Sequence, residues 1–149
     1  MSEMLGNQYF LAGRFEDAII ELEKTLLQNP DNYSAKKKLI ISYLQVNKLE
    51  SSLLLFAEVI NKDINIIIET DPVKDCCPCP DIIYSVIKND FDLNEDEKYL
   101  RLGILWLYCD AEESLSYFNK IITIGKWDDI IRKIKNKLSC IKQPHYKEK

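Results

Sequence analysis

The chain is poor in glycine, proline and histidine. Its 149 residues include 4 Gly, 5 Pro and 1 His, and Pro30 is the one proline in the segment 1–70. Proline cannot continue a helix and glycine weakens one, so this scarcity leaves room for long helices in the first half of the chain. The lone histidine, His145, excludes motifs that need two histidines on one helix.

Long hydrophobic runs are also missing. No run of about 18 apolar residues is present, so the sequence predicts no membrane span. The N-terminal Met-Ser-Glu-Met lacks the basic and apolar regions of a secretory signal. The 5 cysteines are an odd number, whereas a disulfide framework uses pairs, and we therefore expect a reducing, cytoplasmic location. Hydrophobic residues at 46% and charged residues at 30% are typical of one globular domain with a real core.

Charge is distributed unevenly along the chain. Residues 126–149 contain eight Lys/Arg and three Asp/Glu, a net charge of +5, and because the whole chain carries −4, residues 1–125 carry −9. A basic end can contact an acidic partner, a nucleic acid or a membrane surface. Aromatic residues are not interleaved with the basic ones, so we interpret this end as a solvated helix face with a frayed tail and predict no nucleic-acid binding.

The sequence contains no catalytic pattern. A Gly-rich phosphate loop, a G-x-S-x-G elbow and an H-E-x-x-H pair are all missing. The acidic pairs Glu16-Asp17, Asp96-Glu97 and Glu112-Glu113 fall in predicted first helical turns, where carboxylates interact favourably with the helix dipole. We therefore expect a protein that is not an enzyme and that needs no cofactor.

The first part of the chain shows the same plan twice. Apolar residues recur at helical spacing on both sides of Gly13-Arg14, and Asn29-Pro30-Asp31 ends the first unit. The second unit predicts a helix over 33–46, after which Asn47 is expected to cap another helix with Glu50 as its capping-box partner. Matching positions recur with a period of about 34 residues, which indicates an internal repeat of helix pairs. They are Tyr9 and Tyr43, Gly13 and Asn47, Phe15 and Leu49, and Leu22 and Phe56.

The pattern changes after Ile60. We expect an irregular helix or turn, then a loop over 71–79 and a short helix over 81–88, which Pro80 can start. Its predicted apolar face consists of Ile82, Ile83, Val86 and Ile87.

Two further capping boxes predict the helices that follow. Asn94 with Glu97 opens a helix to about Tyr108, and Asp110 with Glu113 opens another to about Thr123. Gly125 ends the second of these, and a last helix is expected over 127–141.

The first unit resembles a tetratricopeptide repeat (TPR). Its Leu5-Gly6, Tyr9, Gly13, Phe15, Ala18 and Pro30 all stand where the family pattern places them, although Ser2 replaces the early tryptophan and Thr25 the last alanine. The second unit keeps Tyr43 but has Ile40, Ser52 and Ile64 in place of the small residue, the first alanine and the proline. Leu102-Gly103 and Trp106 copy the start of a further unit. The resemblance implies an all-α fold, a right-handed superhelix of antiparallel helix pairs with a C-terminal capping helix.

The resemblance also suggests a division of the chain. We predict a single TPR-like domain over residues 1–142 and a flexible tail over 143–149. The expected parts of the domain are a repeat over 2–35, a repeat over 36–62, an irregular insert over 63–93, a divergent repeat over 94–125 and a capping helix over 126–142. The abrupt start inside a repeat leaves open an upstream neighbour in a longer chain.

In the TPR family the first helices of the repeats line a concave groove that binds peptides. The resemblance thus predicts an adaptor that binds a peptide or helix of another protein. A helix that is apolar on more than one side needs a second partner, which supports this reading. Carried over by position, the groove would use Asn7, Phe10, Leu11, Lys37, Lys38, Ile41, Leu44, Gln45, Arg101 and Tyr108.

Two observations bear on that groove. In an alternative interpretation, residues 61–93 fold back and fill it. Asn7 matches one position of the clamp with which some TPR proteins read a C-terminal carboxylate, but Glu3 replaces the lysine expected there. The sequence therefore disfavours an adaptor for acidic chain ends.

The segment Asp75-Cys76-Cys77-Pro78-Cys79-Pro80-Asp81 contains three of the 5 cysteines. C-x-x-C spacing can hold zinc, but no second pair of ligands matches it, so the sequence offers half a site. Cys79 at a helix start could instead be a reactive thiolate. We expect a reduced, metal-free loop. Two alternatives for the chain stay open: a thiol or metal sensor that uses Cys76, Cys77 and Cys79, and a homo-oligomer that assembles through exposed repeat ends.

Overall fold

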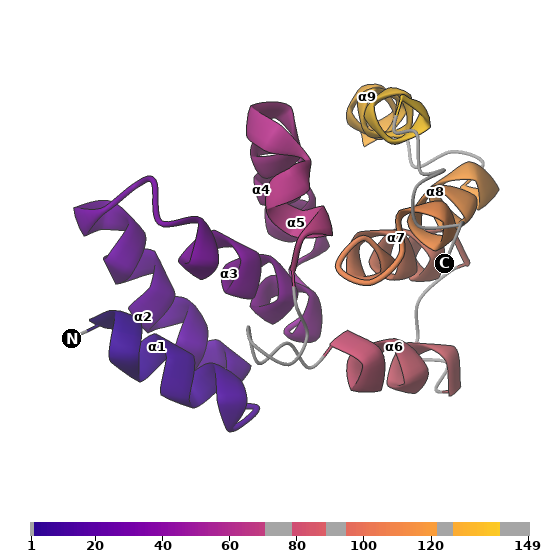
Figure 1. The fold of residues 1–149 in the computed structure, drawn as a ribbon. Helices are drawn as coiled ribbons and strands as arrows, with labels where there is room; N and C mark the ends of the chain where they lie inside the picture. The colour runs from indigo at the N-terminus through magenta and orange to yellow at the C-terminus, as the bar shows by residue number, and fades with distance from the viewer. Residues whose placement is uncertain (1, 71–78, 89–94, 122–126, 141–149) are drawn as a thin grey trace.

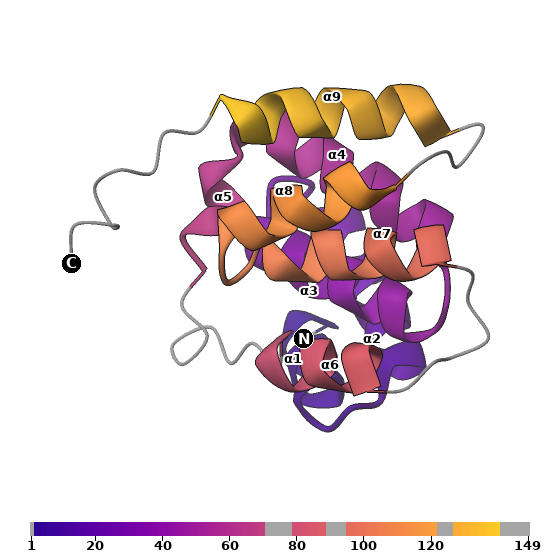
Figure 2. The same cartoon turned by 90° about the vertical axis from the view of Figure 1, so that its right-hand side faces the viewer.

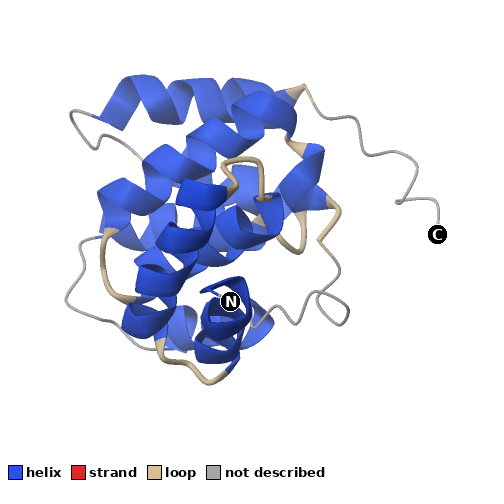
Figure 3. Cartoon of the chain, turned by 90° about the vertical axis from the view of Figure 1, so that its left-hand side faces the viewer, coloured by secondary structure: helices blue, strands red, loops and turns tan. Residues whose placement is uncertain are grey.

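The structure is a computed structural model that describes residues 2–70, 79–88, 95–121 and 127–140. Every regular element in these residues is a helix, as Figure 3 shows, so the expected all-α class is confirmed. Figure 1 labels the helices. In chain order they are α1 (Ser2–Leu11), α2 (Phe15–Gln28), α3 (Tyr33–Gln45), α4 (Leu49–Asp63), α5 (Asn65–Ile68), α6 (Cys79–Lys88), α7 (Glu95–Trp106), α8 (Ala111–Lys120) and α9 (Asp128–Ser139).

Helices that follow each other through a short turn pack as pairs. α1 packs against α2, α3 against α4, and α7 against α8, and α2 also packs against α3, so the first four helices form one continuous stack (Figure 1). The third pair joins this stack through contacts of α7 with α4. α3 contacts α1 and receives hydrogen bonds from α7, so the first helices of the three pairs meet around α3.

The turns inside the first two pairs have the same backbone geometry. Gly13 has φ 77° and Asn47 has φ 63°, both in the left-handed region. In each turn the N–H of this residue donates to the carbonyl three residues earlier at 3.1 Å, and the next N–H donates to the carbonyl five residues earlier at 2.8 Å. These two bonds form a Schellman motif, the helix ending that favours glycine or asparagine. The period of about 34 residues seen in the sequence therefore separates two turns of the same backbone geometry, at Gly13 and at Asn47.

The prediction that Asn47 caps α4 is wrong. Lys48 stands at the N-cap position and makes no side-chain cap bond. Asn47 ends α3 instead, because asparagine tolerates the left-handed conformation. Asp110 does cap α8, since its carboxylate accepts hydrogen bonds from the N–H groups of Glu112 and Glu113. Asn94, the other expected cap, lies outside the described residues.

Small residues lie where the two helices of each pair cross. Ala18 is completely buried in the first pair. Ser52 in the second pair donates its hydroxyl hydrogen bond to Ile40 O at 2.9 Å, and Ser114 in the third donates to Gly103 O at 2.6 Å. The two residues of the bond are 12 apart in the second pair and 11 apart in the third, so the third turn is one residue shorter.

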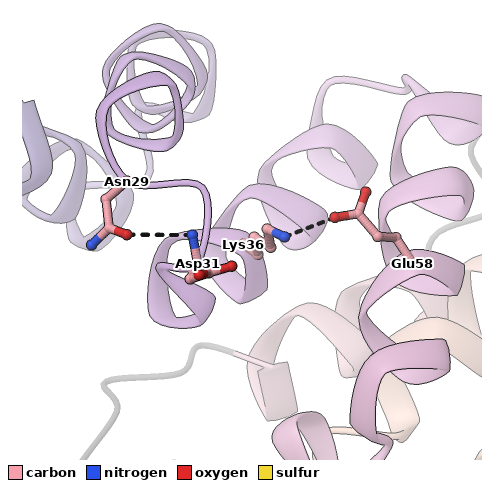
Figure 4. A network of polar contacts seen from close by, with 4 residues as sticks. All are labelled: Asn29, Asp31, Lys36 and Glu58. Atoms are coloured by element: carbon pink, nitrogen blue, oxygen red, sulfur yellow. Dashed lines mark hydrogen bonds and ion pairs between the residues drawn. The ribbon is translucent and has the colours of Figure 1, made fainter.

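Figure 4 shows a hydrogen bond in the connection between the first two helix pairs and an ion pair within the second pair. In the connection from α2 to α3, Asn29 Oδ1 accepts a hydrogen bond from the N–H of Asp31 at 3.3 Å. Between α3 and α4, Lys36 Nζ donates to Glu58 Oε2 at 2.7 Å. The Lys36 side chain is only 10% exposed, so this ion pair lies at the edge of the core.

The insert between the second and third pairs is helical in two places. α4 leads through Ile64 directly into α5, whose Ile67 is completely buried. α6 packs against α7, on the side of the third pair that faces away from α9 (Figures 1 and 2). Ile82, Ile83 and Val86 form its buried face as predicted, but Ile87, one turn after Ile83 at the edge of that face, is 47% exposed.

α9 closes the far end of the helical stack. It lies across α4 and α8, as Figure 2 shows, and buries Ile131, Ile134 and Leu138 at helical spacing. Its basic side chains Arg132, Lys133 and Lys137 are exposed, in agreement with a solvated outer face. Among the described residues, no helix combines the length and the hydropathy needed to cross a membrane.

Candidate functional site

A small cavity opens where α1, α3, α5 and the turn after α7 meet. Its volume is about 130 Å³. We call it the α3 cavity, because α3 supplies most of its lining. The residues that line it are Phe10, Tyr33, Ser34, Lys37, Lys38, Ile41, Ile66, Thr70 and Tyr108.

The inner walls of the α3 cavity are apolar and fixed. Phe10 and Ile41 are buried, and the Phe10 ring meets the Phe15 ring edge to face with centroids 5.8 Å apart. Tyr108 is buried as well, and its hydroxyl donates a hydrogen bond to Lys37 O at 2.8 Å. Burial raises the pKa of Tyr108 well above its ordinary value, so its hydroxyl stays protonated and keeps this bond to α3.

Hydroxyls and ammonium groups surround the mouth of the cavity. Lys37 Nζ donates to Thr70 Oγ1 at 3.0 Å, and Lys38 Nζ donates to Ser34 Oγ at 3.0 Å. The first bond ties α3 to Thr70, two residues after the end of α5. The second bond joins residues one helical turn apart on α3, where side chains are neighbours. Among the described lining residues, the mouth therefore presents two ammonium groups beside an apolar interior.

The structure brings five of the ten predicted groove residues together around this cavity. They are Phe10, Lys37, Lys38, Ile41 and Tyr108. The sequence assigned them through positions in three different helix pairs, and the packing of α1 and α7 against α3 makes them neighbours. The remaining five lie elsewhere.

Leu44 and Arg101 are not surface contacts, which corrects their assignment to the groove. Leu44 is completely buried and is not among the described residues that line the cavity. Arg101 is buried too, and its Nη1 donates to Leu44 O at 2.5 Å while its Nη2 donates to Gln45 Oε1 at 3.3 Å. Burial lowers the pKa of Arg101. The guanidinium thus caps the C-terminal end of α3, where carbonyl groups favour a cation.

Asn7, Leu11 and Gln45 lie outside the cavity. Leu11 is 61% exposed on α1, and Asn7 is half-buried. Gln45 is half-buried and accepts the hydrogen bond from Arg101. These three residues neither line the cavity nor join one another in a second site.

Sequence reasoning missed Tyr33, at the start of α3, and Ile66 and Thr70 as lining residues. Ile66 and Thr70 belong to the insert, which has no periodic match to the repeats. The one signal was the alternative in which residues 61–93 fold back into the groove. That alternative holds in part, since the chain around α5 forms one wall of the cavity while α6 packs against α7.

The cysteine segment gives no site among the described residues. Cys79 is the first residue of α6, and Cys76 and Cys77 lie outside the described ranges. Cys109 and Cys140 are free thiols on the surface. Partial burial of the thiol and the charge of Asp110 raise the pKa of Cys109, so its thiol is protonated at neutral pH. No group of three His, Cys, Asp or Glu side chains that could hold a metal ion occurs in the described part of the chain.

Comparisons of the chain with models of protein families, with curated proteins and with solved structures found no match. The α3 cavity can accept one apolar group and present ammonium and hydroxyl donors beside it.

Proposed function

We propose that this chain is a TPR-like adaptor, a superhelix of helix pairs that binds a peptide or helix of a partner protein at the α3 cavity. Equivalent Schellman turns at Gly13 and Asn47 and a small residue at each helix crossing support the repeat assignment. The observation that carries the function is the α3 cavity itself, an apolar hollow on the side where the first helices of the pairs meet.

The size of the cavity suits one side chain of a partner. Its volume of about 130 Å³ is close to that of a cavity of about 150 Å³ that holds one benzene ring. A leucine, methionine or phenylalanine side chain from a bound peptide therefore fits, and it would contact Phe10, Ile41 and Tyr108. Because these walls are already buried and fixed, little ordering of the protein accompanies binding.

The charge of the mouth suits acidic residues beside that side chain. Of the described lining residues, two are lysines and none is acidic. A carboxylate next to the inserted apolar residue would interact favourably with the ammonium groups of Lys37 and Lys38. The proposed ligand is therefore an internal peptide segment in which one large apolar residue is flanked by Asp or Glu.

Selection from a random peptide library tests this function. Ser34 is exposed at the mouth of the cavity and lies in the first turn of α3, so Ser34→Trp covers the mouth without altering the core. We expect selected peptides to carry an apolar residue flanked by acidic ones. Ser34→Trp should weaken their binding by about tenfold or more, as measured by fluorescence anisotropy.

Ser51→Trp is the matched control. Ser51 is an exposed serine in the first turn of α4, remote from the cavity lining. This variant should bind the selected peptides as the wild type does. Peptides that bind both variants and the wild type equally would place their site elsewhere, and failure to enrich any peptide sequence would sink the adaptor proposal.

A further inference from the structure

A second hollow lies on another face of the same helices, between α2 and α4. It is a shallow groove of about 580 Å³. We call it the α2–α4 valley, and it shares no described lining residue with the α3 cavity. The residues that line it are Glu23, Leu26, Leu27, Leu39, Tyr43, Ser51, Leu54, Leu55 and Glu58.

The walls of the valley expose large apolar side chains. Leu27 on α2 is 85% exposed and Leu54 on α4 is 47% exposed. Ile20, which is 53% exposed, extends the row on α2, because residues seven apart lie on the same face of a helix. Single exposed apolar residues are ordinary, but a row of them along a groove marks an interaction surface.

The pattern of this face is repeated in the first two helix pairs. Glu16 and Ile20 on α2 are both exposed and one turn apart, and the equivalent positions one repeat later are Glu50 and Leu54, again exposed. In the third pair Ser114 is equivalent to Ser52, so Leu54 corresponds to Ser116, which is polar. The apolar and acidic face is therefore a property of α2 and α4, and the common repeat architecture does not require it.

The charged groups that line the valley are acidic. They are Glu23 and Glu58, and no lysine or arginine is among the described lining residues. The Tyr43 hydroxyl donates to Glu23 Oε2 at 2.5 Å, which holds that carboxylate at the valley wall. Lys36 pairs with Glu58 from a buried position and offsets part of its charge, which leaves Glu23 as the stronger anchor.

We propose that the α2–α4 valley binds a basic amphipathic helix of a partner protein. The apolar side of that helix, with residues at i, i+3 or i+4 and i+7, would lie over Leu27 and Leu54. Lysine or arginine side chains on its flanks would reach Glu23 and Glu58. Charge complementarity with an acidic, apolar groove decides in favour of this occupant.

The same charge argument disfavours two other occupants. A second copy docked through a two-fold axis would bring two acidic patches together, because such an interface pairs a patch with itself. An anionic membrane surface would be repelled by the same carboxylates. Both are distinguishable by experiment.

A designed peptide tests the proposal directly. The probe is a fluorescent peptide of about 18 residues, about five helical turns, with a leucine row flanked by lysines. Its control carries glutamate in place of every lysine. We expect the lysine peptide to bind and the glutamate peptide to bind at least about tenfold more weakly, with affinity for the lysine peptide falling as salt is raised.

Variants locate the binding. Ser51→Trp, which fills the valley, and Leu27→Ser, which removes a highly exposed apolar side chain without adding charge, should each weaken lysine-peptide binding by about tenfold or more. Glu23→Gln keeps an acceptor for Tyr43 while it removes the charge, and it should weaken binding by about twofold to fivefold. Ser34→Trp, which covers the α3 cavity, should leave binding unchanged, so the two proposals fail or succeed independently.

Four results would overturn the proposal. The first is no binding of the lysine peptide at about 1 mM, and the second is equal binding of the lysine and glutamate peptides. The third is a dimer in sedimentation equilibrium that Ser51→Trp dissociates, which would assign the valley to a second copy. The fourth is binding to phosphatidylserine vesicles that Leu27→Ser abolishes, which would assign it to a membrane.

Discussion

Gly6 of α1 and Leu22 of α2 lie so close together that a Cβ on Gly6 would stand 2.8 Å from Leu22 Cδ2. Leu22 is completely buried, so it has no room to turn away. The third helix pair repeats this relationship, since a Cβ on Gly103 would stand 2.9 Å from the Phe118 ring. The absence of a side chain at Gly6 lets α1 approach α2, and its absence at Gly103 lets α7 approach α8. These close approaches help to set where α1 and α7 lie relative to α3.

Gly6→Ala and Gly103→Ala should each destabilise the fold by about 1–3 kcal/mol, the usual result of overpacking a fixed core. Urea denaturation followed by circular dichroism measures this loss as a lower transition midpoint. If the clash is the cause, Gly6→Ala will be less harmful in a Leu22→Ala background than in the wild type. An equal loss in both backgrounds would assign the effect to something other than the contact with Leu22.

Substitutions at the two Schellman turns test the backbone conformation, whereas those at Gly6 and Gly103 test packing. A Cβ on Gly13 would have no atom within 4 Å, so Gly13→Ala carries only the backbone penalty of a left-handed residue, about 1–2 kcal/mol. Asn47→Ala should lose a similar amount, because asparagine tolerates φ 63° better than alanine does. Asn47→Gly should be neutral or slightly stabilising. The same denaturation measurement checks all three variants, and a neutral Gly13→Ala would contradict the left-handed assignment.

The first two helix pairs, α1 with α2 and α3 with α4, could be predicted from the sequence because periodicity and turn chemistry agree there. Gly13 is a clear helix-ending signal. Asn47 is ambiguous, since asparagine serves both as an N-cap and as a left-handed helix ending, and Glu50 three residues later imitates a capping box. Only the backbone angle distinguishes the two, and it shows that Asn47 ends α3.

The candidate site was predictable only in part. Phe10, Lys37 and Ile41 could be predicted as lining residues, because their positions on α1 and α3 lie on the groove side of the repeats that the sequence resembles. Ile66 and Thr70 come from an insert whose packing depends on long-range contacts that leave no local pattern. Whether a position on that side is open or covered also depends on α7, which buries Leu44 and places Arg101 against the end of α3.

Tyr43 predicts a loss of stability at alkaline pH. Burial, and then the hydrogen bond to Glu23 and the charge of Glu23, raise the pKa of Tyr43 above its ordinary value of 10.0. In the unfolded chain the phenol therefore loses its proton first, so the unfolded state is favoured as pH rises above 10.0. The contribution of Tyr43 to the free energy of unfolding should be fully present below that pH and decline above it. Tyr43→Phe should flatten this decline in urea denaturation between about pH 9 and 11.

Two other groups influence the same range and define the control. Burial also raises the pKa values of Cys109 and Tyr108. The Tyr43→Phe variant is therefore best compared with its parent protein in a Cys109→Ala background, which alters a surface thiol. Tyr108 keeps some alkaline slope in both proteins. An alkaline slope that Tyr43→Phe leaves unchanged would show that Tyr43 titrates alike in the folded and unfolded chain.

Two substitutions of Ser52 separate the contributions of small side-chain size and of hydrogen bonding to stability where α3 and α4 cross. Ser52→Ala removes the bond to Ile40 O but keeps the small volume, and Ala18 occupies the equivalent place in the first pair. A carbonyl inside a helix still accepts its backbone N–H, so the loss should be about 1 kcal/mol. Ser52→Val replaces the hydroxyl by a methyl group and adds a second methyl group at a completely buried crossing, and it should cost about 2–4 kcal/mol, since overpacking adds to the lost bond. Urea denaturation of both variants gives the comparison. Equal losses for alanine and valine would mean that the hydrogen bond, and not the close approach of α3 and α4, determines which residue this position accepts.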